Sequence, residues 1–198
     1  MKAFYILALG LLSLSLHAEP AEVIVIRHAE KPRDRDDNHL SPAGRARAER
    51  LPEFLKQNPE LAKLGPPAAL FATHLTKEGH GLRTIETLEP LAKCLDLKIE
   101  TPFQSDNADK LAAQLLSKKK YNGKTVLISW THEYIPELIE SLGIHPAPEK
   151  LPDDAYDRVY LIRYTADGPK LEMYRQDMES VPAPKHPRLF HFGKKKPN

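Results

Sequence analysis

Two histidines directly follow apolar segments that have the composition of buried β-strands. Residues 23–26 lead into Arg27-His28, and residues 126–130 shortly precede His132. Continuous β-branched runs of this kind are typical of parallel sheets, whose strands meet with their carboxyl ends at the edge where ligands bind. A single histidine at a strand end is more often structural than catalytic. Two of them, one after an arginine and one before a glutamate, favour a shared catalytic site.

The order of these residues along the chain resembles a known catalytic set. Arg27, His28, Arg83 and His132 are similar to the catalytic residues of the histidine phosphatase (phosphoglycerate mutase-like) superfamily. Residues 40–44 (Leu-Ser-Pro-Ala-Gly) resemble that family's "LSxxG" segment, and residues 83–87 (Arg-Thr-Ile-Glu-Thr) resemble its "RTxxT" segment. The resemblance covers nearly the whole chain after its N-terminal apolar segment. It implies a small phosphatase that lacks a large inserted cap and uses no metal or other cofactor.

The chemistry of a phosphate monoester accounts for these residue types. The phosphoryl group is nearly a dianion at neutral pH, and the guanidinium forks of Arg27 and Arg83 suit its oxygens. By the resemblance, His28 attacks phosphorus as a neutral imidazole and carries the phosphoryl group as phosphohistidine, so that one displacement becomes two. His132, when protonated, adds a donor where negative charge grows. Flanking cations disfavour the charged form of His28 and so keep it nucleophilic.

The leaving alkoxide needs a proton, and three carboxyl groups are candidates for the donor. Glu133 is the first choice because it follows His132, where one branch of the superfamily carries an acidic residue. Another branch takes its donor from a loop after the third strand, which makes Asp106 or Asp109 the alternative. A site with no dedicated acid also stays open. Glu133 near a helix N-terminus would in addition suit the helix dipole, and the two roles are compatible.

Segments near these residues either take part in the site or are ordinary surface segments. Lys31 and Arg33 either reach a phosphate or lie in solvent, and we favour solvent. Residues 73–82 contain two histidines and two glycines, and they form either a loop at the mouth of the site or an ordinary surface loop. Substrate identity depends on this segment and on residues 145–157. Three aspartates in the latter are expected to cap a turn: Asp153, Asp154 and Asp157.

Strand-like and helix-like segments alternate along the chain. Buried strands are expected at 23–26, 69–72, 97–99 and 126–130, and a hairpin at 159–164 and 171–175 with its turn at 167–169. Helices are expected from the N-cap pair Ser41-Pro42, over 84–95 and 106–117, and from about Tyr134 to Gly143. Pro52 and Pro90 are expected to kink or shorten their helices. This pattern predicts an α/β fold, a three-layer α/β/α sandwich whose mostly parallel central sheet carries an antiparallel edge hairpin.

The two ends of the chain differ from the part between them. Lys2, the apolar residues 3–16 and the small Ala18 have the anatomy of a secretory signal, which predicts a signal peptide over 1–18 and a periplasmic or secreted protein. An uncleaved anchor is the alternative. Residues 19–181 are expected to form one catalytic domain. Residues 182–198 are a Pro-rich basic tail, either solvated or attracted to an anionic envelope surface.

Composition limits the partners. The net charge of +2 argues against a general nucleic-acid binder, and Cys94 as the single cysteine excludes internal disulfides. The expected partner is a small-molecule or envelope phosphate ester, with no stable membrane insertion after cleavage. Two rival classes remain. One is a metal-dependent hydrolase using His74, His80, His132 and Glu133, although no spacing matches a known zinc site. The other is a non-catalytic protein that binds a phosphate ester or an envelope lipid.

Overall fold

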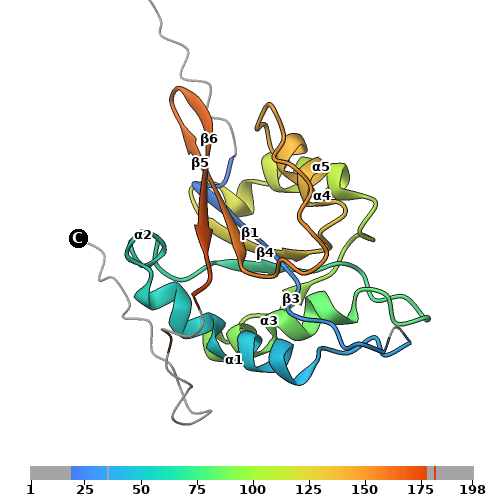
Figure 1. Ribbon diagram of the computed structural model, residues 1–198. Coiled ribbons are helices and arrows are strands. Elements are labelled where there is room, and N and C mark those ends of the chain that lie inside the picture. Colours follow the sequence, from blue (N-terminus) through green and yellow to red (C-terminus); the bar gives the residue numbers. More distant parts are fainter. Residues whose placement is uncertain (1–18, 35, 178–180, 182–198) are drawn as a thin grey trace, which may run out of the picture.

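The computed structural model describes residues 19–34, 36–177 and 181. In this part of the chain, six strands form one sheet that is covered by helices (Figure 1). The predicted signal segment 1–18 and the tail 182–198 lie outside the described residues. The strands are β1 (Glu22–Arg27), β2 (Ala69–Phe71), β3 (Ile99–Glu100), β4 (Thr125–Trp130), β5 (Arg158–Thr165) and β6 (Gly168–Arg175). The helices are α1 (Pro42–Gln57), α2 (Pro59–Ala62), α3 (Leu82–Leu95), α4 (Ala108–Ser117), the 3-10 helix η1 (Lys119–Tyr121) and α5 (Ile135–Ser141).

The strand order across the sheet is β3-β2-β4-β1-β5-β6. Strands β1 to β4 pair in parallel, whereas β5 pairs antiparallel with both β1 and β6. The predicted α/β class, the mostly parallel sheet and the antiparallel edge hairpin are therefore confirmed. The two strands that precede the histidines, β1 and β4, are direct neighbours, and Arg27 pairs with Trp130 at their carboxyl ends.

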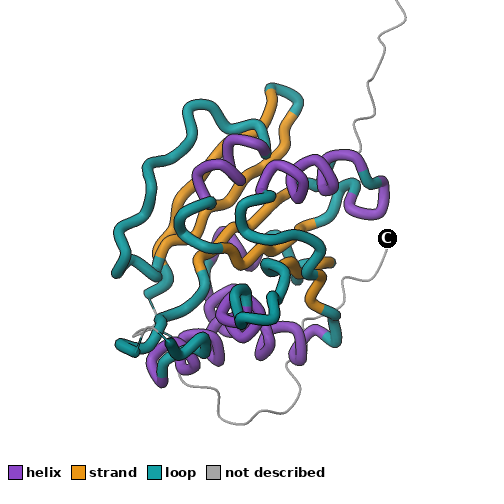
Figure 2. Tube along the Cα trace, turned by 90° about the vertical axis from the view of Figure 1, so that its right-hand side faces the viewer, coloured by secondary structure: helices purple, strands orange, loops and turns teal. Residues whose placement is uncertain are grey.

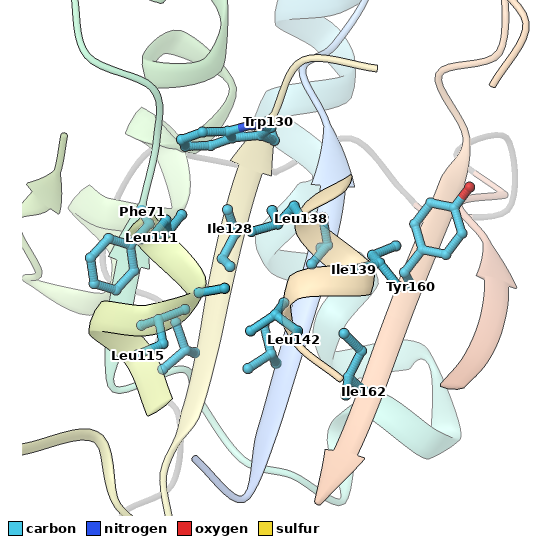
Figure 3. Packing of buried hydrophobic residues seen from close by; sticks show 14 of the residues in the cluster. Phe71, Leu111, Leu115, Ile128, Trp130, Leu138, Ile139, Leu142, Tyr160 and Ile162 are labelled. Atoms are coloured by element: carbon cyan, nitrogen blue, oxygen red, sulfur yellow. The ribbon is translucent and has the colours of Figure 1, made fainter. Parts of the chain in front are cut away.

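Helices cover both faces of the sheet (Figures 1 and 2). Because successive side chains of a strand point to opposite faces, β1 contributes to two separate cores. Val23 and Val25 belong to the cluster beneath α4 and α5, whereas Ile24 and Ile26 belong to the cluster beneath α1, α2 and α3. Figure 3 shows the first cluster, in which side chains of α4 and α5 lie over those of the strands. The central strands β1, β2 and β4 are thus buried on both sides, as their continuous apolar runs predict, whereas the strand expected at 97–99 is the short and only partly buried β3.

The prolines inside α1 and α3 do not shorten these helices, so that part of the prediction is wrong. α1 continues through Pro52 and α3 continues through Pro90. An internal proline removes a backbone hydrogen bond and costs about 3 kcal/mol. Both helices, however, bury an apolar face that includes Leu51 and Phe54 in α1 and Leu88 and Leu91 in α3. Each such side chain contributes roughly 1.5–3 kcal/mol, which outweighs the missing hydrogen bond.

The predicted N-cap at Ser41 is confirmed, whereas the predicted hairpin turn is shorter than expected. The Ser41 hydroxyl accepts a hydrogen bond from the amide of Gly44 at 3.0 Å, as expected for an N-cap. The hairpin is tighter than predicted, because Gly168 and Pro169 already belong to β6 and pair with Thr165 and Tyr164. Within the described ranges, no helix has the length and apolar character needed to cross a membrane.

Candidate active site

A cavity of about 420 Å³ lies where β1 and β4 end and α3 begins. Arg27, His28, Arg83, His132 and Glu133 all line it, so the structure brings together the two histidines, the two arginines and the first-choice proton donor. The amide of His28 donates to the carbonyl of Trp130 at 3.1 Å, which continues the pairing of β1 and β4 as far as the histidine. The backbone of His28 is therefore held by the centre of the sheet.

The imidazole of His28 is buried and has a defined tautomer. Its Nδ1 lies 2.7 Å from the carbonyl oxygen of Ala29. A carbonyl oxygen only accepts, so Nδ1 carries the proton of the neutral ring and Nε2 holds the lone pair. Burial lowers the pKa of His28 to about 3, and the positive charges of Arg27, Arg83 and His132 act in the same direction, against the opposing effect of the Ala29 carbonyl. The ring is therefore neutral in weakly acidic and neutral solution.

Arg27 is oriented by the loop that precedes β5. Its Nη1 donates to the carbonyl oxygens of Pro152 at 3.0 Å and Ala155 at 2.9 Å. The guanidinium carbon lies 4.0 Å from the centre of the Tyr156 ring, a cation–π contact. The other two nitrogens, Nε and Nη2, are buried, and no described residue accepts a hydrogen bond from them. Buried donors without partners cost about 1–3 kcal/mol each, and an anion in the adjoining cavity would satisfy them.

Arg83 is held in a similar way from the opposite wall. Its Nη2 donates to the carbonyl of Asp37 at 2.7 Å and its Nε donates to the carbonyl of His39 at 3.2 Å. Glu86, one turn later in α3, in turn accepts hydrogen bonds from the His39 ring and from the amide of Leu40. α3 therefore supplies both Arg83 and the Glu86 carboxylate, which holds the segment whose carbonyls bind Arg83.

His132 is paired with a residue for which the sequence predicted another role. Its Nε2 lies 2.8 Å from Oδ1 of Asp153, whose side chain is 81 % exposed. Burial and the charge of Arg27 lower the pKa of His132, while Asp153 and Glu133 act to raise it. Asp153 lies in a turn, as expected, and its carboxylate is in addition bound to the second histidine of the site.

The structure separates the candidate proton donors by position. Glu133 and Asp106 both line the cavity, whereas Asp109 is in the first turn of α4 and is not among the lining residues. Lys31 is exposed, as the solvent interpretation predicts, and it also lines the cavity. Arg33 is exposed and is not among the lining residues, in line with the solvent interpretation.

Two threonines of the "RTxxT" segment fasten the strand ends to α3. The Thr87 hydroxyl accepts from the amide of Ala29 at 2.9 Å, immediately after the nucleophile candidate. The Thr84 hydroxyl accepts from the amide of Thr73 at 3.2 Å, two residues beyond the end of β2. Both bonds are buried. The segment thus positions the Ala29 carbonyl that sets the tautomer of His28.

Gly44 lets α1 approach the same turn. A Cβ at this position would lie 2.4 Å from the carbonyl oxygen of Glu30. That oxygen accepts a hydrogen bond from the amide of Ser41 at 2.9 Å, and the Glu30 carboxylate receives two-pronged hydrogen bonds from Arg47 of α1. The glycine of the "LSxxG" segment is therefore required by close packing against the residues that follow His28.

The segment between β2 and α3 forms one side of the mouth of the cavity. His74, Thr76, Gly79, His80 and Gly81 all line it, which supports the first of the two interpretations given above. A Cβ at Gly81, whose φ is +92°, would lie 2.3 Å from the carbonyl oxygen of His74. The loop consequently folds back tightly on itself before α3 begins.

Sequence reasoning gave the loop between α5 and β5 a part in substrate identity but missed its contacts with the site residues. Asp153 and Tyr156 contact His132 and Arg27, and Tyr156 also lies 6.0 Å from the His28 ring between centroids. The available signal was weak. It consisted of a polar stretch with one aromatic residue, directly before a predicted hairpin.

Among the described residues, no group of three or more His, Cys, Asp or Glu side chains is placed to hold a metal ion. No model of a known protein family matches the chain, and no curated protein matches it significantly.

Proposed function

We propose that this protein is a metal-independent phosphomonoesterase of the histidine phosphatase superfamily, acting through a phosphohistidine at His28. The observation that carries the proposal is the state of His28. A neutral imidazole, with Nδ1 bound to a carbonyl and Nε2 left with its lone pair, lies in a cavity shared with Arg27, Arg83 and His132. A nucleophile surrounded by anion-binding groups suits attack on a phosphate dianion.

The first step transfers the phosphoryl group to the protein. The Nε2 lone pair of His28 attacks phosphorus, the N–P bond forms, and the P–O bond to the leaving group breaks. Arg27 and Arg83 bind the non-bridging oxygens, where their charges are most effective in a partly desolvated site. Glu133 donates a proton to the leaving oxygen, so an alcohol departs rather than an alkoxide.

The second step returns the protein to its starting state. Water attacks the phosphohistidine, and the Glu133 carboxylate accepts a proton from it. The N–P bond breaks, its electron pair returns to Nε2 of His28, and inorganic phosphate leaves. In the net reaction, a phosphate monoester and water give an alcohol and inorganic phosphate.

The assignment of Glu133 over Asp106 is tested with two leaving groups. Glu133→Gln should lower kcat on glycerol phosphate, a poor leaving group, by about 10²-fold, and change p-nitrophenyl phosphate turnover much less. Asp106→Asn is the matched control, since Asp106 lines the same cavity. The opposite pattern would transfer the role to Asp106.

The proposed activity is tested with p-nitrophenyl phosphate in EDTA between acidic and neutral pH. The wild type should turn over, His28→Ala should not, and His145→Ala should match the wild type because His145 is exposed and outside the cavity. Activity that survives in His28→Ala would contradict the mechanism. Activity abolished by EDTA and restored by one metal would favour a metal-dependent hydrolase. Phosphate-ester binding without turnover would favour a binding protein.

We also propose that the protein acts in the periplasm or outside the cell on a small or exposed phosphoryl group. The support for export is the composition of residues 1–18, with one lysine and an apolar stretch. Fractionation of cells that express the full chain or residues 19–198 tests this directly. The full chain should appear outside the cytoplasm, and the shortened chain should remain inside. Equal distribution of both would contradict export by this segment.

A further inference from the structure

The loop between α5 and β5 contacts three of the four residues proposed to act on the phosphoryl group. Two of its carbonyls accept hydrogen bonds from Arg27, at 2.9 and 3.0 Å. The Tyr156 ring lies against the Arg27 guanidinium and near the His28 ring. Asp153 accepts a hydrogen bond from His132 at 2.8 Å. These contacts point to a role in ordering the site rather than in joining two elements.

Asp153 differs from the other contacts of this loop because it is charged and faces solvent. Its side chain is 81 % exposed, whereas that of His132 is 9 % exposed. An exposed carboxylate stays hydrated while it accepts the hydrogen bond, so the pair avoids the cost of burying two charges. The hydrogen bond from His132 lowers the pKa of Asp153, and the charges of Lys31 and Arg27 add to this effect. Asp153 is therefore ionised in neutral solution.

We propose that Asp153 is a positioning residue that acts through His132. By accepting a hydrogen bond from Nε2–H, the carboxylate fixes the orientation of the ring and leaves Nδ1 as the nitrogen with which His132 donates to a phosphoryl oxygen. Its negative charge also favours the doubly protonated ring that this donation requires. The inference rests on the proposed phosphatase function and adds a residue that the family resemblance did not indicate.

The need for such a partner follows from the surroundings of His132. Burial and Arg27, at the end of β1, lower the pKa of His132. Glu133, next to it in the chain, and Asp153, from the loop, act to raise it. His28 is a further neighbour, and the charge of His132 contributes to lowering the pKa of His28. Removing the charge of Asp153 should therefore lower the pKa of His132 further and make the ring neutral at a lower pH.

The test compares three variants by kinetics and by NMR. Asp153→Asn keeps a hydrogen-bond acceptor but removes the charge, Asp153→Glu keeps the charge, and Asp154→Asn removes the same charge from the neighbouring exposed residue. In Asp153→Asn, kcat for p-nitrophenyl phosphate at pH 7 should fall by about tenfold, with a smaller change in KM. The alkaline limb of the pH–rate profile of Asp153→Asn should move to lower pH. Asp153→Glu should recover much of the loss, and Asp154→Asn should retain the wild-type profile.

The NMR titration of the His132 ring in substrate-free protein provides a readout that does not depend on turnover. The pKa of His132 should be lower in Asp153→Asn than in the wild type or in Asp154→Asn. An unchanged pKa and an unchanged alkaline limb would overturn the inference. A higher kcat/KM in Asp153→Asn would also overturn it, because the carboxylate would then be competing with the substrate. Failure of the proposed function itself is recognised separately, by activity that survives in His28→Ala.

Discussion

His28 combines burial with a cationic environment, and both effects keep its imidazole neutral. The unprotonated Nε2 is available at a pH where an exposed histidine, with a pKa near 6.5, would already be charged. Arg27 and Arg83 have a double effect, because the guanidinium groups that would bind phosphate also disfavour protonation of the nucleophile. At the residue scale, the proposed nucleophilicity and anion binding would thus depend on the same two arginines.

The pKa of His28 can be measured without any substrate. We expect NMR to show that His28 titrates at about pH 3, well below its ordinary value of 6.5. In Arg83→Gln the pKa should rise, because one of the charges that oppose protonation is removed. A His28 ring that titrates near 6.5 in the wild type would contradict the described burial and the proposed neutral nucleophile.

At the scale of elements, α1 and α3 hold the turn that follows β1. α3 does so through the Thr87 hydroxyl, and α1 through the close approach at Gly44. Both act on the backbone of Ala29 and Glu30, and the Ala29 carbonyl orients the His28 ring. The two short sequence segments that carry the family resemblance therefore have a defined structural task in this chain.

The hydrogen bond from Ala29 to Thr87 is tested by Thr87→Val. The valine has nearly the same shape but leaves a buried amide without an acceptor, at a cost of about 1–3 kcal/mol. We expect urea unfolding to show that loss, together with a fall in kcat of about tenfold or more as the His28 ring loses its fixed orientation. Thr87→Ser keeps the hydroxyl and serves as the control. A fully active Thr87→Val would show that this hydrogen bond does not position the site.

The close approach at Gly44 is tested by Gly44→Ala. In an unconstrained helix this change stabilises by roughly 1 kcal/mol. Here the added Cβ would meet the Glu30 carbonyl at 2.4 Å, so we expect a net loss of about 1–3 kcal/mol and a lower kcat. Ala43→Ser, on an exposed position of the same turn, should change stability by less than about 0.5 kcal/mol. A more stable and fully active Gly44→Ala would refute the packing argument.

At the scale of the whole molecule, the sheet follows from patterns that are local in sequence. Strands β1, β2 and β4 contain continuous apolar runs, and their alternation with helices was enough to predict the layers and the place where His28 and His132 meet. The supports of Arg27 were not predictable in this way. The carbonyls that hold it lie 125 and 128 residues away along the chain. Every residue has a backbone carbonyl, so no sequence pattern indicates which carbonyls accept the hydrogen bonds of Arg27.

Asp153 and Tyr156 went unrecognised for a related reason. Their loop has no periodicity from which its path over the sheet edge could be deduced, and a carboxylate before a strand is a common turn residue. The internal prolines of α1 and α3 led to the wrong prediction that these helices are shortened. Their local effect was outweighed by the burial of apolar side chains against other elements. Local rules thus predicted the elements, whereas the shape of the site depended on long-range contacts.

The low pKa of His28 has a consequence for the stability of the whole fold. Above about pH 6.5 the ring is neutral in both the folded and the unfolded chain, so it adds no pH dependence. As the pH falls from about 6.5 to about 3, the unfolded chain takes up the proton and the folded chain does not. The free energy of unfolding should therefore decrease through this range, by a contribution on the order of 4 kcal/mol from this group.

Urea unfolding at pH 7 and pH 4 measures this contribution. His28→Asn keeps a side-chain donor for the Ala29 carbonyl but has no group that titrates in this range. Its stability should fall less than that of the wild type between the two pH values. An equal fall in both proteins would show that His28 is not the group responsible.

The measurement that tests the central claim most directly is rapid acid-free quenching of the reaction with a ³²P-labelled monoester in EDTA. The proposal predicts label bound to the wild-type protein within one turnover, stable to alkali and lost in acid, and mapping to the peptide that contains His28. His28→Ala should take up no label. Turnover by the wild type with no protein-bound label, or label that persists in His28→Ala, would contradict a phosphohistidine at this residue.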